Sequence, residues 1–205
     1  MFGSARHVNP EAGDHAVSID PVEQSAAQAA VRASWREFPY YARRYGERGW
    51  RFSLSDTGWI QTLCHLGAGE AQAQAGWLGK LLATRGMPTY LLERHLLLLH
   101  RELLQVARDR ELRYARLPEC AGWLRETRLA QIPENRFDEL AGQFETRVRG
   151  RVAHVANMGV IVVAAAADER AGIAGAVASL ESWLCDPSRF DSEWIVAVRD
   201  TVAAV

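Results

Sequence analysis

The chain has 205 residues, of which 48% are hydrophobic and 24% charged, and its formal net charge at pH 7 is −1. These values are ordinary for a globular protein. A net charge so close to zero gives no bulk attraction to nucleic acid or to an anionic membrane, so we expect neither as a partner. Lys80 is the only lysine among 24 basic residues, a bias that suggests a GC-rich bacterial genome.

The spacing of the cysteines and the length of the apolar runs indicate in which cellular compartment the protein is found. The cysteines Cys64, Cys120 and Cys185 are far apart and form no C-x-x-C motif, which predicts reduced thiols and not a disulfide framework or a zinc site. The N-terminal residues lack an apolar segment of signal-peptide length. The longest apolar run, 155–167, is shorter than the ~20 residues that span a bilayer. We therefore expect a cytoplasmic protein.

The N-terminal residues differ in character from the rest of the chain. Residues 1–18 mix Gly, Pro, Asn and Asp without periodicity, which predicts a flexible tail, followed by a single helical domain over residues 19–205. The first helix begins at Asp20, which can cap it, with a proline in its first turn, and runs to about Glu37. Pro39 ends this pattern.

The next segment, FPYYARRYGERGWRF at 38–52, is rich in aromatic and arginine side chains. Such side chains can stack on a planar ligand and bind its carboxylates, which predicts a ligand pocket. The alternative is a short amphipathic helix whose tyrosines fill the edge of the core while its arginines stay solvated. The candidate pocket contacts are Tyr40, Tyr41, Arg43 and Arg44.

A capping box at 53–56 predicts the start of a further helix, which carries Trp59 and Cys64 and ends near Gly67. Its last turn contains His65, which can interact with the negative end of the helix or approach the same pocket. Cys64 and His65 are adjacent and point about 100° apart on a helix, so they do not form a catalytic pair.

Two helices follow in the middle of the chain. The first runs from about Glu70 to Thr84 and stops at Gly86, and the second runs from Pro88 to Val106. The second helix carries apolar residues at alternating steps of four and three, the pattern of one buried face. That face consists of Leu92, Leu96, Leu99, Leu103 and Val106.

The Pro88 helix also carries two histidines, His95 and His100. They flank the apolar face on opposite sides, so they cannot both bind one metal ion from this helix. Either could be the axial ligand of a haem iron while leucines contact the porphyrin, with His100 preferred. The alternative is that each histidine is structural and bonds to a carboxylate or a backbone carbonyl. A di-iron site needs Glu and His three residues apart, and neither Glu93 nor Glu102 has that spacing.

The C-terminal part also has helical patterns. A helix from Pro118 ends before Pro133, and a long one from Glu134 continues through Val152 and Val155. The run VIVV at 160–163 has strand character, but we interpret it as helix because no other convincing strand could pair with it. Asp168 should cap the next helix, which ends before Pro187, and residues 188–205 supply the last one. Small residues at 164–167 and 172–176 permit close helix approach or self-association.

Together these patterns predict an all-α, single-domain bundle of about eight helices. A histidine on a leucine-rich helix resembles the globin architecture at the level of the fold only. The sequence contains no Walker loop, G-x-S-x-G or H-E-x-x-H motif. It favours a non-catalytic binding or sensory module for haem or another tetrapyrrole, with a pocket that also includes Trp59 and His65. The alternatives are a ligand-free interaction or regulatory protein that dimerises through its C-terminal helices, and a metal-dependent helical oxygenase.

Overall fold

The computed structural model describes residues 1–151 and 154–205, and α-helices dominate them. The predicted all-α class is therefore confirmed. Contacts between Cα atoms group the chain into two compact units: unit 1 comprises 1–76 and 93–123, and unit 2 comprises 77–92 and 124–205. Three helices contribute residues to both units, namely α3 (Ala68–Ala83), α4 (Thr89–Val106) and α6 (Arg116–Leu129).

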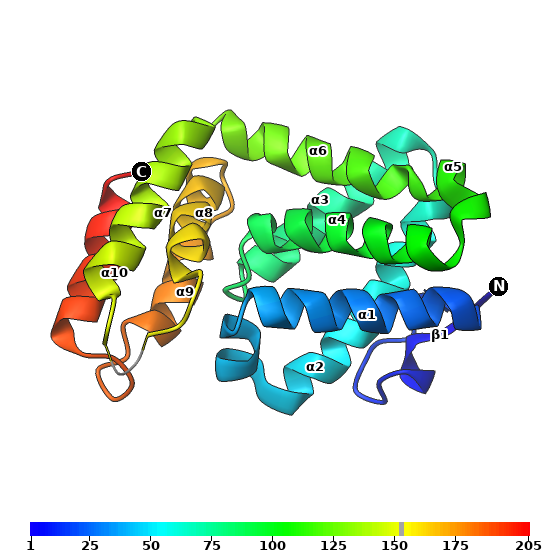
Figure 1. Ribbon diagram of the computed structural model, residues 1–205, viewed down its shortest axis with the longest axis horizontal. Coiled ribbons are helices and arrows are strands. Elements are labelled where there is room, and N and C mark those ends of the chain that lie inside the picture. The colour runs from blue at the N-terminus through cyan, green and yellow to red at the C-terminus, as the bar shows by residue number, and fades with distance from the viewer. Residues whose placement is uncertain (152–153) are drawn as a thin grey trace. The chain divides into compact units, whose positions relative to one another are not determined.

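In addition to its parts of the shared helices, unit 1 contains α1 (Pro21–Glu37) and α2 (Tyr40–Ile60) (Figure 1). Shorter elements complete it: η2 (Gln61–His65), η3 (Arg108–Arg110) and α5 (Glu111–Tyr114). The predicted start of α1 is confirmed, since the Asp20 carboxylate accepts a hydrogen bond from the Val22 amide at 2.9 Å. The predicted apolar face of α4 is buried except at Val106, which lies at its last turn.

The course of α2 differs from the sequence prediction. The capping box at 53–56 does not begin a helix, because Ser53 lies inside α2 and its hydroxyl donates to the Gly49 carbonyl at 3.0 Å. The break in α2 lies at Gly46, with φ 55° and ψ −153°. Glycine lacks a Cβ, so this backbone conformation costs it little. The chain thus bends at Gly46 and not before Ser53.

The N-terminal residues are structured, so the prediction of a flexible tail at 1–18 is wrong. Strand β1 (Phe2–Ser4) pairs antiparallel with β2 (Ala16–Ser18), and the short helix η1 (Ala5–His7) follows β1. The apolar side chains of this segment form a small buried cluster, and each run is too short to show periodicity in the sequence. The cluster contains Ala5, Ala12 and Val17, with Val8 and Trp59 against it.

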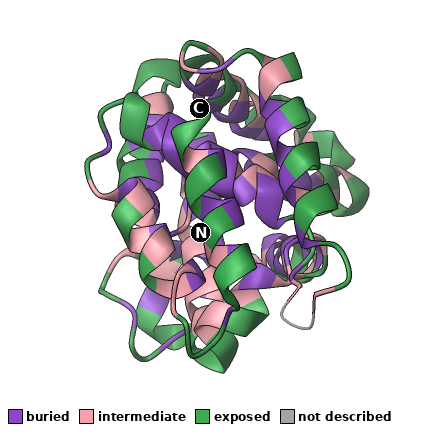
Figure 2. Ribbon diagram, turned by 90° about the vertical axis from the view of Figure 1, so that its left-hand side faces the viewer, coloured by how far each residue is buried: buried purple, intermediate pink, exposed green. Residues whose placement is uncertain are grey.

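Unit 2 has four helices besides the shared ones: α7 (Glu134–Val148), α8 (Met158–Arg170), α9 (Ala176–Leu184) and α10 (Ser192–Ala203). Figure 2 shows their buried residues on the faces turned toward one another. The interpretation of 160–163 as helix is confirmed, because these residues lie in α8. The long helix from Glu134 is shorter than predicted: it ends at Val148, and Val155 lies outside any helix. Val152 lies outside the described residues.

The sequence predicted that Asp168 caps the next helix, but the structure shows that it joins α8 to α4 instead. It lies within α8, and its carboxylate accepts hydrogen bonds from the backbone amide of Thr89 at 2.8 Å and from the Thr89 hydroxyl at 2.5 Å. It therefore satisfies a free amide in the first turn of α4, which has no partner inside its own helix. Burial raises the pKa of Asp168 to about 6, although the bonds from Thr89 and the charge of Arg128 act in the opposite direction.

The small residues of α8 allow two helices of unit 2 to approach closely. Residues 164–167 are at most 5% exposed, and a Cβ placed on Gly159 would lie 2.3 Å from the Ala141 carbonyl oxygen of α7. Packing inside unit 2 thus covers the small residues of α8, whereas Gly172 and Ala174 of the second predicted stretch are exposed. Of the described helices, none has both the length and the apolar composition needed to cross a membrane.

We expect Gly159→Ala to lower the free energy of unfolding by about 1–3 kcal/mol, because the new methyl group overlaps the Ala141 carbonyl. Gly142→Ala is the matched control: it lies at an exposed position of α7 with nothing within 4 Å of the added Cβ, so it should raise stability by up to about 1 kcal/mol. Urea unfolding of both variants measures the difference. Equal stability of the two variants would contradict the close approach of α7 and α8.

Asp168 should make stability depend on pH. Its pKa of about 6 in the folded protein lies above its ordinary value of 3.8, so the folded state holds the proton more tightly. The free energy of unfolding should therefore fall as the pH rises from about 4 to about 6, by up to about 3 kcal/mol. Asp168→Asn should remove this decrease, as urea unfolding at several pH values would show. A variant with the same pH profile as the parent would refute the assignment.

Candidate functional site

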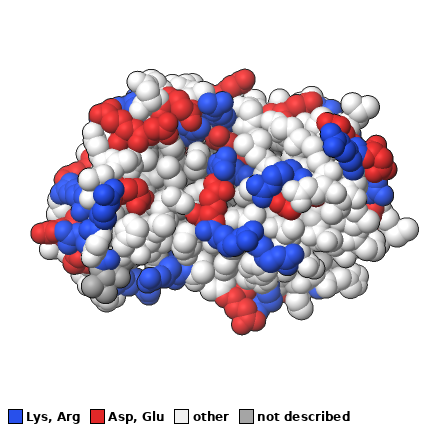
Figure 3. All heavy atoms as spheres, viewed as in Figure 1, with Lys and Arg blue, Asp and Glu red and all other residues white. Residues whose placement is uncertain are grey.

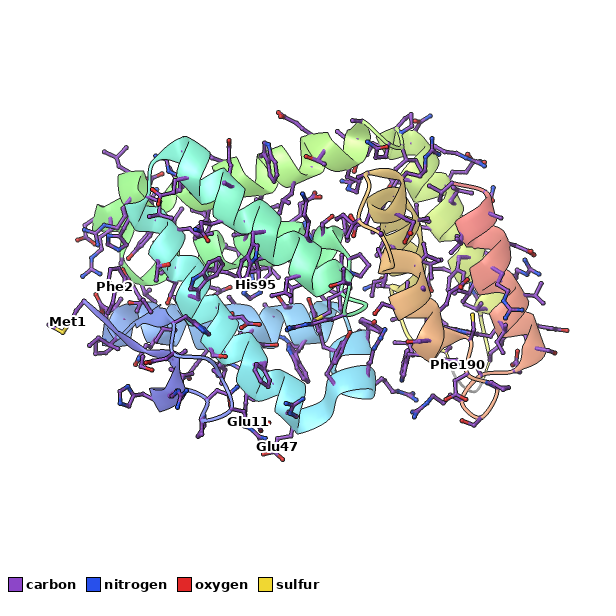
Figure 4. The ribbon with its side chains drawn as sticks, turned by 180° about the vertical axis from the view of Figure 1, so that it is seen from behind. Met1, Phe2, Glu11, Glu47, His95 and Phe190 are labelled. Atoms are coloured by element: carbon purple, nitrogen blue, oxygen red, sulfur yellow. The ribbon has the colours of Figure 1, made fainter. Side chains whose placement is uncertain are left out.

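His95 occupies the interior of unit 1, where it joins three helices (Figure 4). From α4, its Nδ1 lies 2.7 Å from the Ser34 hydroxyl of α1, and its Nε2 lies 2.9 Å from the Thr57 hydroxyl of α2. Thr57 gives its single hydroxyl proton to the Ser53 carbonyl at 2.6 Å, so it must accept from the Nε2–H group. Ser34 then donates to Nδ1, which fixes the tautomer through the hydrogen-bond network.

This environment keeps the His95 ring neutral. Burial lowers its pKa to about 4, because the imidazolium form would lose its hydration. Both ring nitrogens are used by hydroxyl groups, so a bond from either one to a haem iron would first have to break a buried hydrogen bond. The geometry matches the structural alternative, with hydroxyl groups as partners in place of the expected carboxylate or carbonyl.

The other two predicted histidines lie in different surroundings. His100 is half-buried on α4, where burial lowers its pKa and the charge of Glu111 raises it. His65 is exposed at the end of η2, and its ring meets the edge of the Phe2 ring at a centroid distance of 5.0 Å. Across 1–151 and 154–205, no group of three or more His, Cys, Asp or Glu side chains is arranged to hold a metal ion.

Of the tyrosines and arginines predicted to contact a ligand, most interact with neighbouring side chains of the protein. The Arg44 guanidinium donates to the Tyr40 hydroxyl at 2.6 Å and lies 5.3 Å from the centre of the Tyr45 ring. Tyr41 stacks on Trp35 with an interplanar angle of 15°. Burial raises the pKa values of Tyr40 and Tyr41, so both phenols stay protonated. Arg43 is exposed, and Trp59 packs against the N-terminal cluster.

An open groove of about 420 Å³ lies beside these contacts, between α1, α2 and α4. Two tryptophans form its aromatic part: the rings of Trp35 and Trp50 meet edge to face, with centroids 5.2 Å apart and an interplanar angle of 82°. The groove is lined by Ala29, Arg32, Trp35, Arg36, Trp50 and Glu102. Sequence reasoning pointed to the segment that holds Trp50 but missed the α1 residues. The spacing of Arg32 and Arg36, one turn apart on a helix, was the available signal.

Local packing holds the Trp35 ring in place. Its Nε1–H group donates to the Ser53 hydroxyl at 3.2 Å, and that hydroxyl donates in turn to the Gly49 carbonyl. A Cβ placed on Gly49 would overlap the Tyr45 Cβ of the same helix, whereas it would lie 3.7 Å from the Trp35 ring, an ordinary contact, so Gly49 is required by the course of α2 after the break at Gly46. The indole therefore has a fixed orientation at the groove.

The charges in the groove are only partly compensated. Many arginines of this chain lie beside acidic side chains, as Figure 3 shows for one face. In contrast, neither Arg32 nor Arg36 forms an ion pair within the described residues. Glu102 is bound by its neighbour Arg101, whose Nε and Nη2 both reach Glu102 Oε1, at 3.0 and 2.7 Å. Within the same residues, Glu102 Oε2 has no hydrogen-bond partner.

Comparison with known proteins gives no functional information. The chain matches no protein-family model, no curated protein and no solved structure. The resemblance to globins therefore has no support from a structural neighbour. The function has to be inferred from the geometry of the groove.

The His95 contacts predict a second pH effect on stability. The folded-state pKa of about 4 lies below the ordinary 6.5, so the unfolded state takes up a proton more readily. The free energy of unfolding should therefore fall as the pH drops from about 6.5 to about 4, by up to about 3 kcal/mol. His95→Gln does not titrate and can still accept from Ser34 and donate to Thr57, so it should lose this decrease.

Urea unfolding of the parent and of His95→Gln at several pH values measures the effect, and the difference between the two profiles isolates His95 from other titrating groups. His65→Gln is the matched control: burial also lowers the pKa of this histidine, but its side chain is exposed, so the variant should change the profile much less than His95→Gln does. A His95→Gln profile parallel to that of the parent would contradict a neutral buried imidazole.

Proposed function

We propose that the protein is a non-catalytic binding module that takes a planar aromatic anion in the groove between α1, α2 and α4. The observation that supports this proposal is the combination of two unpaired arginines, Arg32 and Arg36, with the rings of Trp35 and Trp50 in one groove. An aromatic wall provides a stacking surface for a flat ring, and the guanidinium groups provide partners for its acidic substituents.

The energies of these contacts are sufficient for a small ligand. Stacking of a ring on an aromatic side chain contributes about 1–3 kcal/mol, and a hydrogen bond to a charged group contributes about 1.5–3 kcal/mol. One stacked ring and two charge-assisted contacts therefore contribute about 4–9 kcal/mol, from which the cost of association has to be subtracted. The volume of about 420 Å³ falls in the range of small-molecule sites.

Haem and other tetrapyrroles belong to this ligand class, because they combine a flat ring with two carboxylate groups. The residues that line the groove include no histidine in the described part of the chain. Stacking and carboxylate binding are therefore the interactions that we propose for a tetrapyrrole here. Axial ligation by His100 or His95 remains a separate prediction, which a comparison of ligands with and without iron can test.

The test is calorimetric titration with pyrenesulfonate, protoporphyrin and haemin. We expect all three to bind, and Arg32→Gln together with Arg36→Gln to weaken the binding by tenfold or more, since at least one charge-assisted contact is lost. Arg43→Gln is the matched control, because Arg43 is an exposed arginine that does not line the groove, and it should leave the affinity unchanged.

Two results would contradict the proposal. Failure of all three ligands to bind would exclude a planar-anion site. A loss of affinity in the Arg43 variant with none in the double variant would place the site in the segment chosen from the sequence and not in the groove. Haemin that binds far more tightly than protoporphyrin, with the difference lost in His100→Ala, would add axial ligation to the proposal.

A further inference from the structure

We infer that the groove selects a guanine nucleotide, in particular a nucleoside monophosphate, among planar anions. This inference rests on the proposed function and deepens it. The observation that carries it is that the groove holds two kinds of charge: the guanidinium groups of Arg32 and Arg36 on α1, and the carboxylate of Glu102 on α4. A ligand that complements both needs an anionic end and an end that donates hydrogen bonds.

The arginines favour a phosphate monoester over a carboxylate. Together they carry two positive charges, and neither arginine forms an ion pair within the described residues. A phosphate monoester carries about −1.5 to −2 charges at pH 7 and three acceptor oxygens, whereas a carboxylate carries one charge. Arg32 and Arg36 lie about 6 Å apart along the helix axis at ~1.5 Å per residue, so both long side chains can reach one phosphate group.

Glu102 favours guanine over other bases. An ionised carboxylate only accepts hydrogen bonds, and the Watson–Crick edge of guanine offers two adjacent donors, the N1–H group and the N2 amine. The same edge of adenine presents an acceptor at N1, which a carboxylate repels. The pairing of Glu102 Oε1 with Arg101 leaves Oε2 available. Both guanine donors would therefore have to reach Oε2, which has two lone pairs, and a hydrogen bond to a charged group contributes about 1.5–3 kcal/mol.

The tryptophans provide a stacking surface for the purine ring, between the phosphate at the arginines and the base edge at Glu102. A purine is a flat bicyclic ring that can stack on one indole face while its edge meets the other ring, since Trp35 and Trp50 are nearly perpendicular. Trp35 already uses one face to stack on Tyr41. The ligand therefore has the opposite face of Trp35 or a face of Trp50 as its stacking surface.

The experiment compares GMP, IMP, AMP and guanosine by calorimetric titration of the parent protein. We expect GMP to bind most tightly. IMP lacks the N2 amine and should bind several-fold more weakly than GMP. AMP should bind at least about tenfold more weakly than GMP. Guanosine lacks the phosphate and should also lose tenfold or more, because the arginine contacts are gone.

Glu102→Gln tests the source of selectivity. We expect this variant to bind GMP and AMP with similar affinity. Its affinity for AMP should be no lower than that of the parent, and this result would show that the variant is folded. Glu70→Gln, an exposed substitution on α3 outside the groove, should keep the preference for GMP. Selectivity for GMP that persists in Glu102→Gln would overturn the role of this carboxylate.

The remaining outcomes separate the inference from the proposed function. Equal affinity for GMP, IMP and AMP with weaker binding of guanosine, or no nucleotide binding while pyrenesulfonate binds, would refute guanine selection and leave the planar-anion site intact. Equal affinity for guanosine and GMP would contradict the arginine contacts and therefore both proposals. Failure of the nucleotides, pyrenesulfonate, protoporphyrin and haemin alike would refute both.

Discussion

The buried imidazole of His95 is the interaction on which unit 1 depends. Its two nitrogens connect α4 to α1 through Ser34 and to α2 through Thr57, and the same three helices form the walls of the groove. Protonation would turn the Nδ1 acceptor into a donor and place a charge in the interior. The geometry of the groove therefore depends on a histidine that does not line it, and we regard His95 as a positioning residue.

Glycine placement in α2 supports the same arrangement. The break at Gly46 redirects the helix, and the missing side chain at Gly49 leaves room for Tyr45 of the same helix. Trp50 follows directly and meets the Trp35 ring edge to face. The aromatic wall thus results from a backbone conformation that glycine tolerates and from a close approach that a larger residue would prevent.

Local signals in the sequence predicted several helices but not the contacts between them. The cap at Asp20 and the apolar period of α4 predicted those helices correctly, because both are short-range features. The partners of His95 lie 61 and 38 residues away, and Asp168 bonds to a residue 79 positions away, so no local pattern could reveal them. The aromatic segment indicated that ligand contacts lie nearby, but Arg32 and Arg36 are recognisable as part of a groove only when α1 lies beside α2.

An unpaired arginine alone carries little functional information, because a solvated guanidinium is stable on any surface. Arg43 is such a residue: it is exposed and has no ion pair in the described residues, yet it lies outside the groove. Arg32 and Arg36 differ in having two tryptophans and a carboxylate beside them. Half-buried indoles next to uncompensated charge leave both apolar surface and positive potential at one place. A flat anion covers the first and neutralises the second, which is why this groove is the strongest indication of function that the chain offers.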